Sequence, residues 1–186
     1  MARPSPCVTI GRGSFHIHFH AVHEKEGSPM AFYSAALFTL VADQLSKYIV
    51  RVTMSVGETI YMGPIRLTHY ENAGMAFSLF QGYARLFAVA AILFVIGVLY
   101  YRKHEAPKGI MINAGLGFLV GGAAGNGIDR ILFGKVTDFL VSRSGDGILN
   151  LADHAINVGI LLLLIQGICT FVVDKWMKYA RRKNVR

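Results

Sequence analysis

The sequence predicts an all-α integral membrane protein, a bundle of four transmembrane helices with a small β cradle outside the cytoplasm. The chain of 186 residues is 53% hydrophobic and only 16% charged, and its apolar residues gather in four long blocks. The blocks cover about residues 31–52, 86–101, 110–128 and 155–173. A span needs about 20 residues and a backbone in lipid must satisfy its own hydrogen bonds. Each block is therefore expected to be a helix, the second being short unless residues 80–85 extend it.

Three segments are expected: a flexible N-terminal extension at 1–29, a four-helix membrane domain at 30–176 and a basic cytoplasmic tail at 177–186. The extension lacks the apolar core and cleavage site of a signal peptide, and Met30 leaves open whether it is a functional tail or an over-long start. Its alternating histidines are weak evidence for a metal site because no acidic motif accompanies them. These are His16, His18, His20 and His23.

The basic residues predict the orientation of the bundle. The formal net charge is +8, but the cations flank the apolar blocks, which indicates membrane helices rather than a nucleic-acid groove. Twelve lysines and arginines lie in three segments: before the first block, at 102–108 and after the fourth block. The loops at 53–85 and 129–154 hold only six, counting Arg51 at the end of the first block. Both termini are therefore expected in the cytoplasm and those two loops outside. Cys7 and Cys169 have no metal or redox spacing and are expected to stay unpaired.

The first outward loop is expected to form a small strand pair at the outer membrane surface. Residues 59–70 are rich in β-favouring types, and Ile65, Leu67 and His69 fall on one side of a period-two pattern. The pair Gly63-Pro64 divides the segment into two short pieces.

Function must be inferred from polar residues that a membrane would otherwise reject. Asp43 and Lys47 lie four apart in the first block, so they share a helical face and can pair, with Gln44 beside them. A structural ion pair and a direct role in a site both remain open for them.

The third block ends in small and polar residues. Gly121 and Gly125 are four apart, which allows close helix packing, and Asn126 shares a face with Arg130. Asp129 and Arg130 would also suit an interfacial charged cap.

Two further acids follow the third block. Asp138 lies in the second outward loop, and Asp153 opens the fourth helix, where an aspartate is commonly an N-cap. Two carboxylates brought together share a proton, so one can accept a proton from water while the other donates to a carbonyl oxygen. That combination favours amide hydrolysis. No base is apparent for Ser142 or Ser144, and no motif places His154.

Five segments together resemble the bacterial lipoprotein signal peptidase family, also called signal peptidase II. They occur in the family's order, over about residues 31–175. The segments are Asp43-Gln44-x-x-Lys47, Asn72-x-Gly74-x-Ala76-Phe77, Gly121-Gly122-Ala123-x-Gly125-Asn126-x-x-Asp129-Arg130, Val136-x-Asp138-Phe139 and Asn150-x-Ala152-Asp153.

The resemblance implies an aspartic endopeptidase of the bacterial inner membrane, without metal or organic cofactor. It would cleave diacylglyceryl-modified prolipoproteins before the lipidated cysteine, near the outer face, and act as a monomer. Lipidated prolipoproteins and membrane lipid are the implied partners, and nucleic acid is not. Asp138 and Asp153 match the catalytic aspartates. The polar residues that match site-lining positions are Asn72, Asn126, Arg130 and Asn150, and the supporting positions are Asp43, Lys47, Gly74, Gly125 and Asp129.

The chain departs from the family pattern in two places, the N-terminal extension and the segment between Asp138 and Asp153. The compact family core has no counterpart of residues 1–29. Only 15 positions separate Asp138 from Asp153, and Leu149 stands where an aromatic residue commonly precedes the asparagine. Two other functions compete: a proton-coupled transporter, and a relative that binds lipidated peptides without cutting them.

Overall fold

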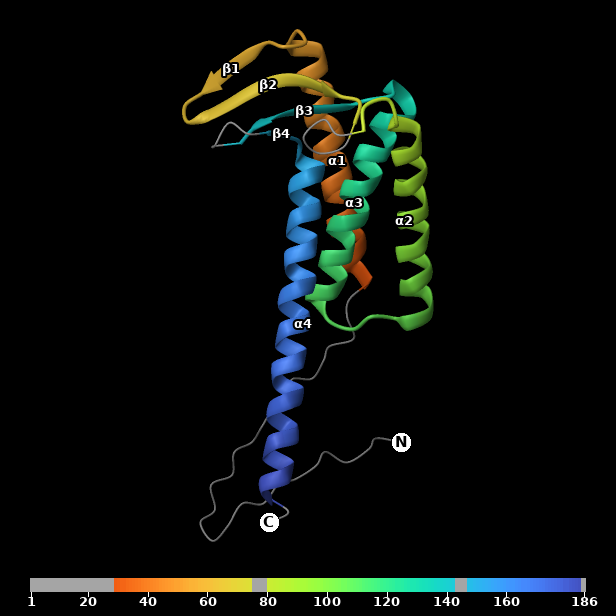
Figure 1. Cartoon of the computed structure of the whole chain (residues 1–186), viewed down its shortest axis with the longest axis vertical. Helices are drawn as coiled ribbons and strands as arrows, with labels where there is room; N and C mark the ends of the chain where they lie inside the picture. Colours follow the sequence, from red (N-terminus) through yellow and green to blue (C-terminus); the bar gives the residue numbers. More distant parts are fainter. Residues whose placement is uncertain (1–28, 75–79, 143–146, 185–186) are drawn as a thin grey trace.

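Four helices lie side by side, with a small sheet across one end of the bundle (Figure 1). The computed structural model describes residues 29–74, 80–142 and 147–184. The helices are α1 (Pro29–Thr53), α2 (Ala84–Glu105), α3 (Ile110–Phe133) and α4 (Leu151–Asn184). All four predicted blocks are therefore helical. The fourth helix is longer than its apolar block, because lysine, arginine and methionine after residue 173 are good helix formers.

Several predicted features lie outside the described residues. These are the N-terminal extension up to residue 28 with its histidines and Cys7, residues 75–77 of the second family segment, and Ser144. Cys169 is described, and it is a free and exposed cysteine on α4.

Helix α3 is the centre of the bundle and contacts the other three helices. Its glycines make this possible, as the sequence predicted for Gly121 and Gly125. A Cβ at Gly121 would lie 2.6 Å from the Ala36 carbonyl oxygen of α1, and one at Gly122 would lie 2.6 Å from the Ala152 carbonyl oxygen of α4. Side chains at these positions would push the neighbouring helices away.

The sheet has four antiparallel strands in the order β1-β2-β3-β4. β1 (Thr59–Met62) and β2 (Ile65–Asn72) form the predicted hairpin, which turns at Gly63 with a φ of 60°. The period-two pattern holds only in part: His69 is buried, but Ile65 is 53% exposed because it lies next to the hairpin turn. β3 (Val136–Val141) and β4 (Ile148–Leu149) lie in the segment that was expected to be a loop.

Strand β3 carries the second half of the chain back to the hairpin. Tyr70 pairs with Asp138 and Asn72 pairs with Val136, with a register shift between Leu67 and Tyr70. An apolar cluster of Val50, Met54 and Phe139 packs this part of the sheet against α1. Asp138 and Asn72 are therefore held at the end of the bundle, and Asp138 belongs to a strand rather than to a loop.

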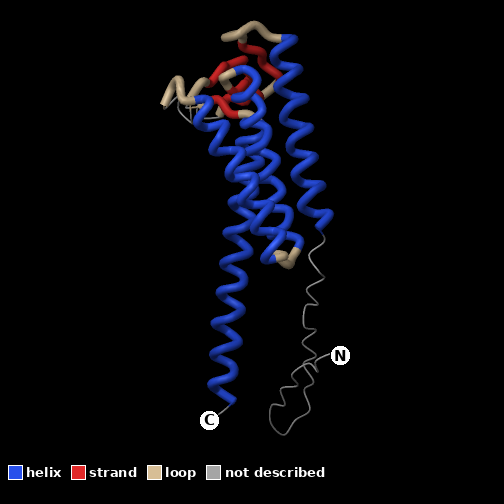
Figure 2. Tube along the Cα trace, turned by 90° about the vertical axis from the view of Figure 1, so that its right-hand side faces the viewer, coloured by secondary structure: helices blue, strands red, loops and turns tan. Residues whose placement is uncertain are grey.

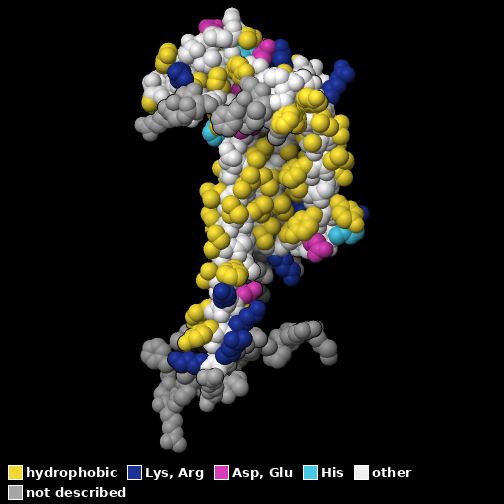
Figure 3. Space-filling view, viewed as in Figure 1, with side chains coloured by type: hydrophobic (Ala, Val, Ile, Leu, Met, Phe, Trp, Pro, Cys, Tyr) yellow, Lys and Arg dark blue, Asp and Glu magenta, His cyan; other side chains and the backbone are white. Residues whose placement is uncertain are grey.

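The helices expose apolar side chains and bury polar ones, the reverse of a water-soluble bundle. On α1, Leu37, Phe38 and Leu45 are exposed, whereas Asp43 and Lys47 are fully buried. Hydrophobic side chains predominate on the visible face of the bundle, and charged ones gather on the lower part of α4 (Figure 3).

Two helices of the described chain, α2 and residues 151–180 of α4, are long and apolar enough to cross a membrane by length and composition. Four spans were expected, and by length and composition only these two qualify. Helices α1 and α3 carry the buried polar groups, which lower their mean hydropathy. Seen from the side, the strands keep to one end while α4 extends past the other helices (Figure 2).

Candidate active site

The predicted site residues converge where the sheet meets the bundle. Asp138 of β3 is 2% exposed and accepts two side-chain hydrogen bonds. Asn72 Nδ2, at the end of β2, donates to Asp138 Oδ2 at 3.1 Å, and Asn150 Nδ2 donates to Oδ1 at 2.5 Å. Both carboxylate oxygens are thus held by amides from different elements.

Asp153 is fixed by the start of α4. Asn150 precedes the helix, and its Oδ1 accepts the Asp153 backbone N–H at 2.9 Å, while Asp153 Oδ2 accepts the Asn150 N–H at 3.3 Å. This is a reciprocal cap in which Asn150 is the N-cap. Asp153 lies in the first turn of α4, so the alternative that Asp153 is itself the N-cap is wrong. Because Asn150 also binds Asp138, one side chain connects both carboxylates.

Asparagine 126 connects Asp153 to a buried lysine. Asn126 Nδ2 donates to Asp153 Oδ1 at 2.8 Å, and its Oδ1 accepts from Lys47 Nζ at 2.8 Å. An amide can do both at once because it carries a donor and an acceptor. The position of Asp153 therefore depends on α1 through α3.

An ion cluster lies beneath the two carboxylates. Lys47 Nζ is 2.8 Å from Asp43 Oδ2 and 3.4 Å from Asp129 Oδ2, and all three side chains are 0% exposed. Asp43 Oδ1 also accepts the Ala152 N–H at 2.9 Å. A Cβ at Gly125 would collide with Asp43 Oδ2, so this position requires glycine for the cluster to fit.

Sequence reasoning did not assign Arg51 and Thr137 to this site. Arg51 Nη1 lies 3.5 Å from Asp129 Oδ1 and 3.1 Å from Thr137 Oγ1, and the Thr137 N–H donates to Asp129 Oδ2 at 3.1 Å. The signal was present, because Arg51 follows Asp43 and Lys47 at four-residue spacing. Gln44 also belongs to the cluster, since its Nε2 donates to Gly125 O at 3.0 Å and to Asp129 Oδ1 at 3.2 Å.

Arg130 positions the segment that carries Asn72. Its Nη2 donates to Gly74 O at 3.0 Å and its Nη1 to Asn126 O at 3.3 Å. The Gly74 N–H donates to Asn72 Oδ1 at 3.0 Å, so the amide of Asn72 is oriented toward Asp138. The shared face of Asn126 and Arg130 is thus confirmed, with a backbone contact between them.

The charges of the described site do not balance. Four carboxylates, Asp43, Asp129, Asp138 and Asp153, lie near three cations, Lys47, Arg51 and Arg130. One proton on the carboxylates would make the group neutral. Burial, followed by the nearby charge of Asp153, raises the pKa of Asp138 from 3.8 to about 6, although Asn72, Asn150 and Lys47 favour its ionised form.

The geometry therefore joins two carboxylates through Asn150, near enough for the charge of Asp153 to raise the pKa of Asp138. Such a pair can activate water and protonate a carbonyl oxygen. Every predicted site residue lies in this connected network, and Asp43, Lys47 and Asp129 lie one layer below the pair. Among the described residues, no group of three or more His, Cys, Asp or Glu side chains could hold a metal ion.

Known proteins resemble this chain over most of its length. A family model described as signal peptidase (SPase) II matches residues 35–171. The lipoprotein signal peptidase of Bacillus velezensis is 36% identical over 141 residues, which cover 73% of this chain and 92% of the relative. The lipoprotein signal peptidase of Listeria monocytogenes is 36% identical over 155 residues, which cover 80% and 98%.

Two solved structures, each described as that of a bacterial membrane enzyme, share the fold. One has a TM-score of 0.68 at 30% identity and covers 73% of this chain and 85% of that one. The other has a TM-score of 0.65 at 29% identity, covering 72% and 89%.

The buried ion cluster predicts an unequal cost of removing two lysines. Lys47→Met leaves two fully buried carboxylates without their shared cation and should lower the free energy of unfolding by about 3–5 kcal/mol. Lys135→Met removes a pair with Glu71 in which the lysine is 41% exposed, so its cost should be about 0–1 kcal/mol. Denaturant titration in detergent micelles measures both. Equal losses would contradict a stabilising role for the cluster.

Proposed function

This chain belongs to the signal peptidase II family of lipoprotein signal peptidases, and on that premise we propose that Asp138 and Asp153 are its catalytic pair. Membership makes it an aspartic peptidase of the membrane that cleaves the signal peptides of prolipoproteins. The observation that supports the pair most directly is Asn150, whose side chain binds Asp138 and whose main chain binds Asp153.

The proposed reaction starts with one proton on the pair, held by Asp138, whose pKa is raised. Ionised Asp153 takes a proton from water as the water oxygen attacks the scissile carbonyl carbon, and Asp138 gives its proton to the carbonyl oxygen. When the carbon–nitrogen bond breaks, Asp153 protonates the leaving amine and Asp138 regains a proton from the diol. The leaving amine belongs to the lipidated cysteine.

Positioning of the two acids is the role proposed for the surrounding polar residues. Asn72 and Asn150 hold Asp138 and Asn126 holds Asp153, while Arg130 holds the Gly74 carbonyl. Preorganised dipoles are effective because they need not reorient during reaction. The layer of Asp43, Lys47, Gly125 and Asp129 supports this arrangement from below.

One chain supplies every residue of the pair and its supports, so the monomer is the proposed active species. Activity per chain should therefore not change on dilution.

All four helices are proposed to cross the inner membrane, with the termini inside and the sheet outside. The exposed apolar side chains on α1 support this, because its polar residues face inward. The basic residues at 102–108 and after 175 mark the cytoplasmic side. The peptidase domain is proposed to be residues 30–176, consistent with the match at 35–171, followed by a basic tail.

Replacing either proposed catalytic aspartate should abolish cleavage. Asp138→Asn and Asp153→Asn should each lower kcat by about 100-fold or more, because general acid–base catalysis contributes at least that much, while the protein stays folded. Glu105→Gln, an exposed acid at the end of α2, is the control and should retain activity. The assay is cleavage of a purified diacylglyceryl-prolipoprotein in detergent. Full activity in either catalytic variant would refute the two-carboxylate mechanism.

Cleavage should decline as pH rises above about 6. The proposed active form needs one proton on the pair, and Asp138 loses its proton near that value. Asn72→Ala removes an N–H donor that favours the ionised carboxylate, so the decline should move to higher pH. The pH profile of kcat/KM measures the shift, with the exposed Asn157→Ala as control. A decline that stayed in place or moved to lower pH in Asn72→Ala would show that Asp138 does not set it.

Labelling of single cysteines tests the topology. In a Cys7→Ser, Cys169→Ser background, Tyr61→Cys places a thiol on exposed β1 and Lys178→Cys places one near the C-terminus. A membrane-impermeant maleimide should label residue 61 in intact spheroplasts and residue 178 only after permeabilisation. The reverse pattern would invert the proposed orientation.

A further inference from the structure

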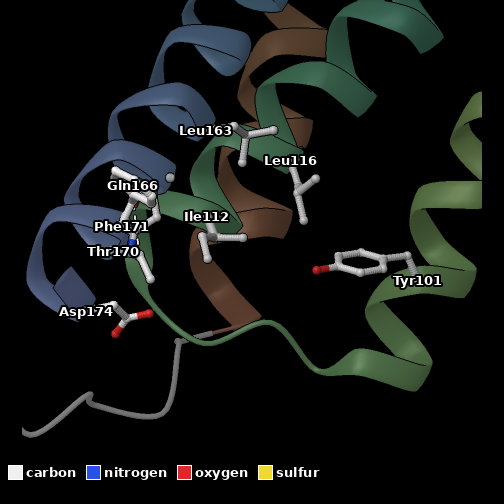
Figure 4. Close-up of a pocket in the computed structure, with 9 residues that line it drawn as sticks. Tyr101, Ile112, Leu116, Leu163, Gln166, Thr170, Phe171 and Asp174 are labelled. Atoms are coloured by element: carbon white, nitrogen blue, oxygen red, sulfur yellow. Dashed lines mark hydrogen bonds between the residues drawn. The ribbon is translucent and has the colours of Figure 1, made fainter. Parts of the chain in front are cut away.

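A hollow lies at the end of the bundle opposite the aspartate pair. It is a cavity of about 590 Å³ between α2, α3 and α4. Its apolar wall includes Ile112, Leu116, Leu163 and Phe171, and Tyr101 extends toward it from α2 (Figure 4). We propose that this cavity binds an acyl chain of a phospholipid whose headgroup carries a primary ammonium, of the phosphatidylethanolamine class. The proposal depends on the bundle lying in a membrane and not on the catalytic mechanism.

The cavity spans the depth at which such a lipid would lie. Helix α4 has 34 residues and α3 has 24, which at ~1.5 Å per residue is about 51 Å against about 36 Å. The lower part of α4 therefore leaves the bundle, and the cavity lies where it does so. Arg102 and Lys103 end α2 at this level and indicate the cytoplasmic headgroup layer. The apolar wall then faces acyl chains, and Asp174 lies at the polar end (Figure 4).

Two opposite charges flank that polar end. Asp174 makes no hydrogen bond or ion pair with another described residue. The Lys175 Nζ atom is 4.9 Å from the ring centroid of Phe171, which lines the cavity. A headgroup with a phosphate and a primary ammonium complements both side chains. A choline headgroup has no N–H to donate to a carboxylate, and a glycerol headgroup carries only negative charge, which Asp174 repels.

The apolar helix of a signal peptide is the competing occupant. Signal peptides begin with a positively charged segment, and Lys175 and Lys178 lie beside Asp174 on α4. They would repel such a segment, whereas they attract a phosphate. The hydroxyl of Thr170 is bonded within α4, to Gln166 O at 3.0 Å. The charges of this end therefore favour a zwitterionic lipid over a basic peptide.

Native mass spectrometry tests this proposal. The purified full-length protein is exchanged into equal amounts of phosphatidylethanolamine, phosphatidylcholine and phosphatidylglycerol with the same acyl chains. Wild type should retain the ethanolamine lipid about 2- to 5-fold over the others, the range for an exposed ion pair. Asp174→Asn should lose the preference but still retain lipid. Glu105→Gln, which removes an exposed acid of α2 outside the cavity, should keep the preference.

A second variant tests the acyl-chain site. Gly167 lines the cavity, and a Cβ there meets no atom within 4 Å, so Gly167→Leu should fill the space without disturbing the fold and reduce lipid retention. Gly97→Leu, equally unobstructed on α2, should retain lipid.

Equal retention of the three lipids by wild type, or an unchanged preference in Asp174→Asn, would overturn the proposal. So would a Gly167→Leu variant with normal lipid retention and a raised KM for prolipoprotein, since the cavity would then serve the signal peptide. Repeating retention with Asp138→Asn separates the two proposals, because lipid binding should persist in a protein that cannot cleave.

Discussion

The buried lysine of α1 sets the constraint on which the site depends. A charge that is 0% exposed must be paired or it destabilises the fold, and Lys47 meets this requirement with Asp43 and Asp129. The same two carboxylates accept main-chain N–H groups, Asp43 from Ala152 at the start of α4 and Asp129 from Thr137 in β3. Neutralising one lysine thus holds together α1, α3, β3 and α4, the elements that carry both aspartates of the pair.

Amide side chains connect the ion cluster to the aspartate pair. Asn126 joins Lys47 to Asp153, and Asn150 joins Asp153 to Asp138. Neutral amides suit this position, because they orient carboxylates without adding a charge that would remove the shared proton. With four carboxylates and three cations near one another, the described site is one proton short of neutrality, and the raised pKa of Asp138 agrees with that balance. The network that supports the fold therefore also holds the two aspartates of the proposed pair.

The outer surface of the helices is apolar, in contrast to the polar interior. Large apolar side chains face outward on α1, α2 and α4, and glycines of α3 bring the helices close enough to close the polar interior. A lipid solvent reconciles these features, since a helix can then bury polar groups against its neighbours and expose apolar ones. The same arrangement leaves an apolar cavity between α2, α3 and α4 where α4 extends past the other helices.

The sequence by itself determined the four helices and the strand pair predicted at 59–70, because apolar runs and turn residues act locally along the chain. The full set of polar site residues came from the resemblance to the family. The sequence also indicated the pairing of Asp43 with Lys47, which are one helical turn apart. Only the tertiary structure decided that Asp138 lies in a strand, that Asn150 caps α4 and binds both carboxylates, and that Arg51 and Thr137 complete the ion cluster. Strand β3 is recognisable only beside β2, and Asp138 becomes buried only when that sheet meets the bundle. Such contacts join residues distant in the chain, and a linear pattern does not specify them.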